Sequence, residues 1–131
     1  MDTAVVVEIS RDCNKQGGPE PGFTQQSTID PMLREIYVMS GLVQDRDLSP
    51  EQVKSNLWVY NIESGSWARV VSPASDPQPF PRWAHQLVYD ATNRVHYLFG
   101  GNPGDAASTD RLGDFWSLSL SRYMCCVYNS N

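Results

Sequence analysis

Two histidines are the residues of this chain best suited to catalysis or metal binding. His85 and His96 stand eleven positions apart on segments that we predict to be neighbouring strands. Imidazole is a frequent zinc ligand and general base, but a metal site needs at least a third ligand in converging geometry. No carboxylate or cysteine stands at a recognisable spacing from the pair, so we predict no metal site. We expect His85 to lie near an inner strand and to hydrogen-bond a neighbouring loop.

A glycine-rich run, Gly100-Gly101-Asn102-Pro103-Gly104, has backbone amides that suit a phosphate group. Phosphate-binding loops of the P-loop type continue with Lys-Ser or Lys-Thr and then open a helix. Neither feature follows Gly104. We therefore predict that this run is a structural turn and not a nucleotide site.

Charged residues in the second half of the chain also favour structural roles. Asp105, Asp110 and Asp114 do not have the spacing of an EF-hand calcium loop. We expect them to be solvated loop acids, with Asp114 shaping a local turn. Arg82 stands at the start of a predicted inner strand, where it can reach a carboxylate on a neighbouring sheet or line a ligand-facing surface. We favour the first of these two roles.

Nucleophilic chemistry is not indicated by the serines or the cysteines. The chain has no Gly-x-Ser-x-Gly motif. Cys125 and Cys126 are adjacent, so they lack C-x-x-C redox spacing and cannot form a comfortable disulfide, and Cys13 stands alone. We therefore predict that the chain is not an enzyme and has no catalytic residues, cofactor or metal.

Composition and charge narrow the class further. The chain has 131 residues and a formal net charge of −5, with no basic run, so binding to nucleic acid is not expected. Its longest apolar runs are only a few residues, which is too short for a membrane span. Three cysteines without framework spacing favour a reducing compartment, and we predict a cytoplasmic location.

The segments that must position these residues recur along the chain. Glu35–Ser40 and Val95–Phe99 both contain the alternation of a pleated strand, and each runs into glycine, at Gly41 and at Gly100-Gly101. Glycine permits the sharp backbone turn that follows such a strand. The second copy stands sixty positions after the first. Positions that match at this offset are Phe23 and Trp83, Gln26 and Gln86, Asp30 and Asp90, and Tyr37 and Tyr97.

Later in each unit the offset falls to 58. It relates Asn56 to Asp114, Leu57 to Phe115, Trp58 to Trp116 and Ile62 to Leu120. Further strands are predicted where β-branched and aromatic residues lie between turn signals: Ala4–Ile9, Phe23–Ile29, Leu57–Ile62, Trp67–Val71, Trp83–Tyr89 and Asp114–Leu120. Ser49-Pro50-Glu51-Gln52 has a capping signature and predicts one or two helical turns. Four strands in a unit of roughly 50 residues are typical of a β-propeller blade, so we predict an all-β fold.

The order of these motifs resembles kelch repeats. From about Gly22 to Arg122, and especially in His85–Asp90 and Val95–Gly104, the chain is similar to the last kelch repeats of the muskelin family. The residues that correspond to the structural kelch motif are Tyr37, Gly41, Trp58, Trp67, His85, Tyr97, Gly100, Gly101 and Trp116.

The resemblance implies kelch-type β-propeller blades, about two of them, forming a partial propeller. Residues 1–21 would hold the outer strand of a preceding blade and a loop, and residues 22–74 one kelch repeat. Residues 81–120 would form an incomplete second repeat, and residues 121–131 a divergent short tail. It also implies a fragment or truncated form, whose partners include the remaining propeller blades of the parent chain.

The same resemblance implies a protein-interaction module of a cytoplasmic adaptor, linked to a CTLH-type E3 ubiquitin ligase complex and to cell-spreading and cytoskeletal responses. A ligand-binding or enzymatic kelch propeller and an actin-binding kelch protein remain as alternatives. We expect protein partners to dock on two long acidic loops, Leu42–Ser55 and Asn102–Gly113, because recognition in compact folds falls to the loops.

Overall fold

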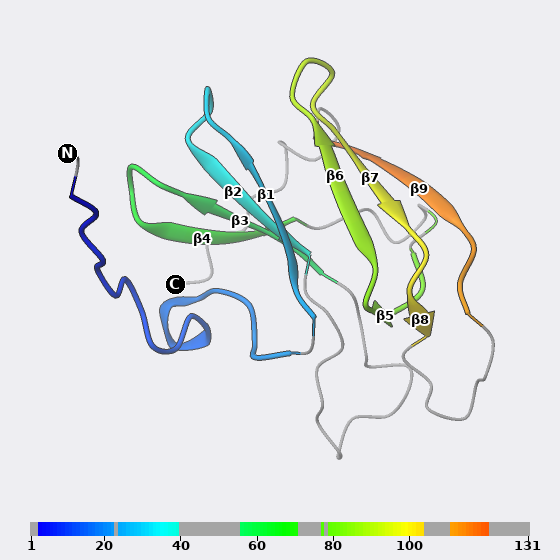
Figure 1. The fold of residues 1–131 in the computed structure, drawn as a ribbon, viewed down its shortest axis with the longest axis horizontal. Coiled ribbons are helices and arrows are strands. Elements are labelled where there is room, and N and C mark those ends of the chain that lie inside the picture. The colour runs from blue at the N-terminus through cyan, green and yellow to red at the C-terminus, as the bar shows by residue number, and fades with distance from the viewer. Residues whose placement is uncertain are drawn as a thin grey trace.

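Antiparallel β-sheets make up nearly all of the regular structure in the computed structural model, so the prediction of an all-β fold is confirmed (Figure 1). The structure describes residues 3–22, 24–39, 56–70, 77, 79–103 and 111–120. In these ranges the one helical element is η1, a single 3₁₀ turn at Asn14–Gln16. No helix in this part of the chain is long and apolar enough to cross a lipid bilayer.

The first sheet is a four-stranded antiparallel meander in the order β1-β2-β3-β4. Its strands are β1 (Gln26–Asp30), β2 (Glu35–Met39), β3 (Leu57–Asn61) and β4 (Ser66–Val70). Asp30 forms the turn between β1 and β2, because its Oδ1 accepts the backbone N–H groups of Met32 and Leu33, both at 2.9 Å. A short polar side chain that bonds its own backbone in this way is a local turn signal.

The second sheet has three antiparallel strands in the order β6-β7-β9. Its strands are β6 (Gln86–Asp90), β7 (Val95–Phe99) and β9 (Phe115–Ser119), and a separate short pair joins β5 (Arg82–Trp83) to β8 (Asn102–Pro103). Asp90 repeats the role of Asp30, since its Oδ1 accepts the N–H groups of Thr92 and Asn93 at 3.0 and 3.3 Å.

The two sheets repeat one backbone plan. β6 and β7 begin and end sixty positions after β1 and β2, and β9 begins and ends 58 positions after β3. Strand registers repeat as well: Gln26 pairs with Met39, and Gln86 with Phe99.

Four non-glycine residues with positive φ strengthen this correspondence. Thr24 (φ 50°) is matched by Ala84 (φ 53°), and Arg34 (φ 57°) by Arg94 (φ 55°), each at an offset of sixty. Residues other than glycine are uncommon in the left-handed region. In each unit one such residue lies just before the first strand and another lies in the turn that follows it, so the same local conformation recurs on both sides of this strand.

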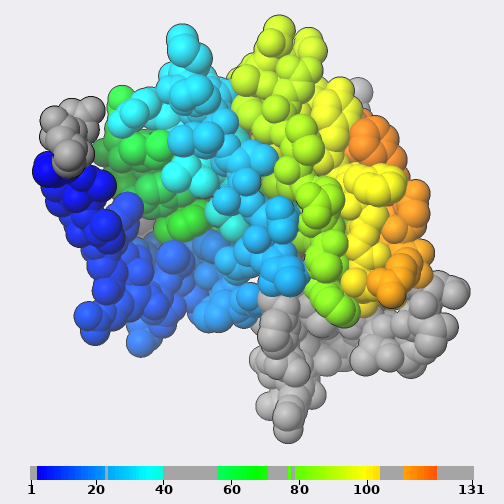
Figure 2. Space-filling model, in the orientation of Figure 1, coloured from blue at the N-terminus to red at the C-terminus, as the bar shows by residue number. Residues whose placement is uncertain are grey.

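The sheets stack face to face with β1 beside β6 (Figures 1 and 2). We call the front face of a sheet the side with Tyr37 in β2 and its equivalent Tyr97 in β7, and the back face the opposite side. The front face of the first sheet packs on the back face of the second. The buried core between them contains Tyr37, Met39, Leu57, Leu87, Leu98 and Leu120, with Val59, Val70, Tyr89, Trp116 and Leu118 packed around it.

Three strand predictions need correction. The strand predicted at Phe23–Ile29 begins only at Gln26, after Thr24 has turned the backbone into the left-handed region. Ala4–Ile9 forms no strand: residues 3–10 have no regular secondary structure, and Val5, Val6, Val7 and Ile9 are all at least 72% exposed. A run of β-branched residues still needs a neighbouring strand to complete its hydrogen bonds, and none of the described strands pairs with it. Trp83–Tyr89 is divided into β5 and β6, because Ala84 turns the backbone into the left-handed region between them.

Several sequence predictions fall outside the described residues. They are the helical turn at Ser49-Pro50-Glu51-Gln52, Gly41, the docking loop Leu42–Ser55, the loop acids Asp105 and Asp110, the adjacent pair Cys125-Cys126 and the tail at residues 121–131. The division of the chain into repeats at residues 22–74 and 81–120 stays a prediction.

Candidate functional site

A polar and aromatic cluster joins the two sheets across their interface. Tyr89 stacks on His96 with ring centroids 4.4 Å apart, and Tyr37 meets His96 edge-on at 4.6 Å. Thr28 Oγ1 lies 3.0 Å from His96 Nε2, and Tyr89 donates to Asp30 Oδ2 at 2.8 Å. These contacts run from the front face of the first sheet to the back face of the second, so they hold the two sheets in a defined relative position.

Titration of this cluster is suppressed by burial. His96 is fully buried, and desolvation lowers its pKa to about 4, so the imidazole is neutral at physiological pH. The phenol of Tyr37 donates to Glu35 Oε2 at 2.6 Å. Burial and this carboxylate raise the pKa of Tyr37, which keeps its hydroxyl protonated. The cluster therefore resists proton transfer instead of promoting it.

His85 differs from our expectation of a bond to a neighbouring loop. Its side chain is fully buried, and neither ring nitrogen has a hydrogen-bond partner. Desolvation, with the nearby Arg82 charge, lowers its pKa to about 4. His85 and His96 are thus both neutral core histidines. In the ranges that the structure describes, no group of three or more His, Cys, Asp or Glu residues has a geometry suited to a metal ion.

The strongest polar interaction links Arg82 in β5 to Asp114, the residue before β9. Two guanidinium nitrogens of Arg82 donate to the two carboxylate oxygens of Asp114 at 2.6 and 2.7 Å. Arg82 also donates to the carbonyl oxygens of Phe80 and Gly100, both at 3.0 Å. The Arg82 side chain is fully buried, and hydrogen bonds from Arg82 and Trp116 lower the pKa of Asp114 to about 2.

This pair confirms a structural role for Arg82 and revises the role of Asp114. The partner carboxylate belongs to the same repeat unit as Arg82, not to a neighbouring one, and Asp114 is more than a local turn residue. At equivalent positions the first unit has Gly22 and Asn56, so the same ion pair cannot form there. Arg82 and Asp114 therefore change together between the two units, as the partners of one interaction would.

The glycine doublet turns the backbone between β7 and β8, as the sequence predicted. Asn102 and Pro103, which we predicted to belong to the same turn, instead form β8. Gly100 and Gly101 have φ values of 61° and 104°. A Cβ atom on Gly101 would lie 2.9 Å from the carbonyl oxygen of Trp83 and 3.2 Å from the backbone of His85. Gly101 therefore allows two backbone segments to approach each other closely, and Gly100 supplies a carbonyl to Arg82.

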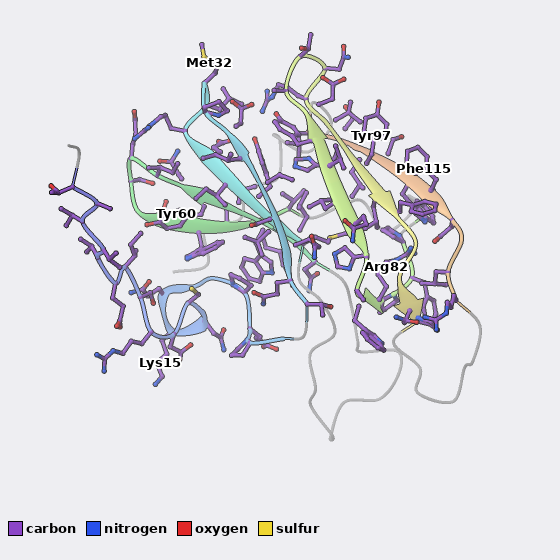
Figure 3. All side chains as sticks on the ribbon, viewed as in Figure 1. Lys15, Met32, Tyr60, Arg82, Tyr97 and Phe115 are labelled. Atoms are coloured by element: carbon purple, nitrogen blue, oxygen red, sulfur yellow. The ribbon has the colours of Figure 1, made fainter. Side chains whose placement is uncertain are left out.

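Large apolar side chains on the front face of the second sheet form the most exposed patch of either sheet. We call these residues the aromatic face: Val88, Tyr97, Phe99 and Phe115. Val88, Phe99 and Phe115 are 62%, 52% and 67% exposed. Tyr97 stacks on Phe115 with ring centroids 5.7 Å apart. Figure 3 shows Tyr97 and Phe115 on the side of the second sheet that points away from the first sheet.

The tryptophans of the predicted kelch motif occupy different environments. Trp58 and Trp67 lie on the back face of the first sheet, and both are half-buried. The indole of Trp67 packs on Gly18, where a Cβ atom would come within 2.9 Å of the ring. It also packs on Tyr60, with the two ring centroids 4.9 Å apart. Trp116 instead lies between the sheets and donates to Asp114.

No protein-family model matches this chain. Its polar side chains with shifted pKa values take part in interactions within and between the sheets, or are buried as neutral groups. Among the described residues, the aromatic face is the best candidate for an interaction surface, because large contiguous apolar patches on a protein surface mark interaction sites.

Proposed function

We propose that the chain is a protein-interaction module built from kelch-type propeller blades. The observation that supports this proposal is the repetition of one antiparallel plan at offsets of 60 and 58, down to the left-handed residues Thr24 and Ala84. Repeating sheets that stack on one another in the same sense are the building principle of propellers. Folds of this kind are most often used to present binding surfaces.

We further propose a muskelin-like cytoplasmic adaptor linked to a CTLH-type E3 ubiquitin ligase complex and to cell-spreading and cytoskeletal responses. This part rests on the kelch-like sequence motifs between about Gly22 and Arg122. The predicted loop Leu42–Ser55 follows β2. The predicted loop Asn102–Gly113, whose first two residues form β8, follows the equivalent strand β7, so the two loops would project from the same rim of a propeller. Their acidic residues would favour a basic partner surface and a salt-sensitive association rate.

The experiment is an affinity purification of the tagged chain from cultured cells, probed for subunits of a CTLH-type ligase. The matched control is Leu98→Asp, which places a charge at a fully buried position and should unfold the chain. Recovery of ligase subunits with the wild type, and not with the control, is the expected result. A folded wild type that recovers no ligase subunit would refute the adaptor role.

Two further assays separate this function from the alternatives. Co-sedimentation with filamentous actin would favour an actin-binding kelch protein, and a stoichiometric bound metal found by elemental analysis would favour an enzymatic propeller. Shortening each acidic loop to a tight turn tests the docking rim. If both shortened variants fold and keep every partner, the loops are not the docking site.

A further inference from the structure

The stacking of the two sheets leaves two unlike sheet faces that no other described sheet covers. The front face of the first sheet is covered by the back face of the second, whereas the front face of the second sheet is the exposed aromatic face. The back face of the first sheet is open along β1, where Ile29 is 54% exposed, and Ile36 beside it is half-buried. These two open faces are the repeat equivalents of the two faces that already pack together.

Residue equivalence gives the alignment in which the open faces would meet. In the covered interface, Thr28 of the first unit contacts His96 of the second, with Oγ1 and Nε2 3.0 Å apart. The corresponding residues on the open faces are Val88 and Ile36. Two polar residues thus meet in the interface between the two sheets, and two apolar residues would meet between the open faces. In each pair the two side chains are of the same polarity.

The second hydrogen bond between the two sheets also has no counterpart that the open faces would have to form. There, Asp30 Oδ2 accepts a hydrogen bond from Tyr89 of the neighbouring sheet. At the equivalent position of the aromatic face, Asp90 Oδ2 accepts the side-chain amide of Asn93 at 2.7 Å, within its own unit. The residue that would face Asp90 is Ile29, which cannot donate. Asp90 Oδ2 therefore has a hydrogen bond without a donor from a second copy, and the apolar Ile29 brings no polar group that would need a partner.

We infer that the aromatic face binds a second copy of this chain, front to back, through the β1 side of the first sheet. The contact places Val88, Tyr97 and Phe115 of one copy against Ile29 and Ile36 of the next. The covered interface places Thr28, Tyr37 and Leu57 in the same relative positions against the second sheet. This inference rests on the strand registers and not on the adaptor role, so its failure would leave the proposed function standing.

Such an interface joins two different surfaces, so one copy can bind on both sides. Interfaces of this head-to-tail type generate rings where the rotation closes and open chains where it does not. Part of the β4 side of the back face is covered by the chain itself, since Gly18 packs on Trp67. Val38 of β2, on the same back face, is also buried. The second copy is therefore confined to the part of this face that holds Ile29 and Ile36, the residues equivalent to Tyr89 and His96.

The test uses two variants that each remove one face. Phe115→Asp places a charge on the aromatic face, and Ile29→Asp places one on the back face; both positions are more than half exposed, so the fold should persist. Sedimentation velocity of the wild type should show oligomers that grow with concentration. Each variant alone should be monomeric, with the dissociation constant raised at least about 30-fold. An equal mixture of the two should form a one-to-one dimer, because each keeps the face that the other lacks.

The controls make every outcome decisive. Met32→Asp, at a turn position that is 88% exposed and off both faces, should associate like the wild type. Val88→Asp is a second front-face variant and should behave like Phe115→Asp, so an unexpected loss of fold in one of them leaves the other. A wild type that stays monomeric at millimolar concentration would overturn the inference. So would a mixture of Phe115→Asp and Ile29→Asp that forms no dimer, because any association would then use other surfaces.

Discussion

Removing the Asp114 carboxylate should destabilise the fold more than removing any exposed carboxylate. Asp114→Ala takes two charge-assisted hydrogen bonds from a fully buried guanidinium and leaves Trp116 without its acceptor. Breaking a buried ion pair from one side costs about 3–5 kcal/mol. The Asp114 side chain is 37% exposed, so water can replace part of what is lost. We therefore expect the lower end, about 3 kcal/mol.

The assay is urea unfolding followed by tryptophan fluorescence, to which Trp116 contributes directly. With an m-value of about 2 kcal/mol/M, a loss of about 3 kcal/mol lowers the midpoint by roughly 1.5 M. The matched control is Asp12→Ala, which removes a carboxylate from the exposed pair with Lys15 and should cost under about 1 kcal/mol. Equal midpoints for Asp114→Ala and Asp12→Ala would refute the importance that we assign to the buried pair.

Three other predictions concern pH, the glycine turn and an indole. His85 and His96 have pKa values of about 4 in the fold against an ordinary 6.5, so the unfolded chain takes up protons first as pH falls. Stability should therefore be full above pH 6.5 and decline between pH 6.5 and 4 by about 2–3 kcal/mol for each histidine, and urea midpoints that stay constant across this range would contradict it. Gly101→Ala should cost about 2 kcal/mol through clash and positive φ, whereas Gly113→Ala, with open space around its Cβ, should be close to neutral in thermal melts. Trp67→Ala should lower the free energy of unfolding by about 2–3 kcal/mol, less than for a fully buried ring, because the indole is only half-buried. If it lowers stability no more than an alanine substitution at an exposed residue does, the contact of the indole with Gly18 does not stabilise the fold.

The sequence was sufficient to predict the strands that alternate, because alternation and turn residues are local signals. β2, β3 and β7 begin at their predicted positions, Glu35, Leu57 and Val95. Ala4–Ile9 shows where local signals fail. Its valines have high β-propensity, but propensity cannot supply the neighbouring strand that completes a ladder.

The interactions that hold the sheets together were harder to predict, since they join residues far apart in the sequence. Nothing near Thr28 indicates that it contacts His96, 68 positions later. The pairing of Arg82 with Asp114 could have been predicted, because both residues differ from their equivalents in the first unit, Gly22 and Asn56. Ala84 gave none, since alanine is not a residue type that indicates a left-handed conformation.

The most direct test of the stacked repeat is a nuclear Overhauser measurement between the rings at the sheet interface. It should be made on Phe115→Asp, which we expect to be monomeric. We expect cross-peaks from the Tyr37 ring to the rings of both His96 and Tyr89, whose centroids lie 4.6 and 5.2 Å from the Tyr37 centroid. The Tyr37 ring should show no cross-peak to the ring of Tyr97, which lies on the other face of the second sheet. Cross-peaks from the Tyr37 ring to the Tyr97 ring, in place of those to His96 and Tyr89, would mean that the second sheet presents its other face to the first sheet, which would contradict the stacked repeat.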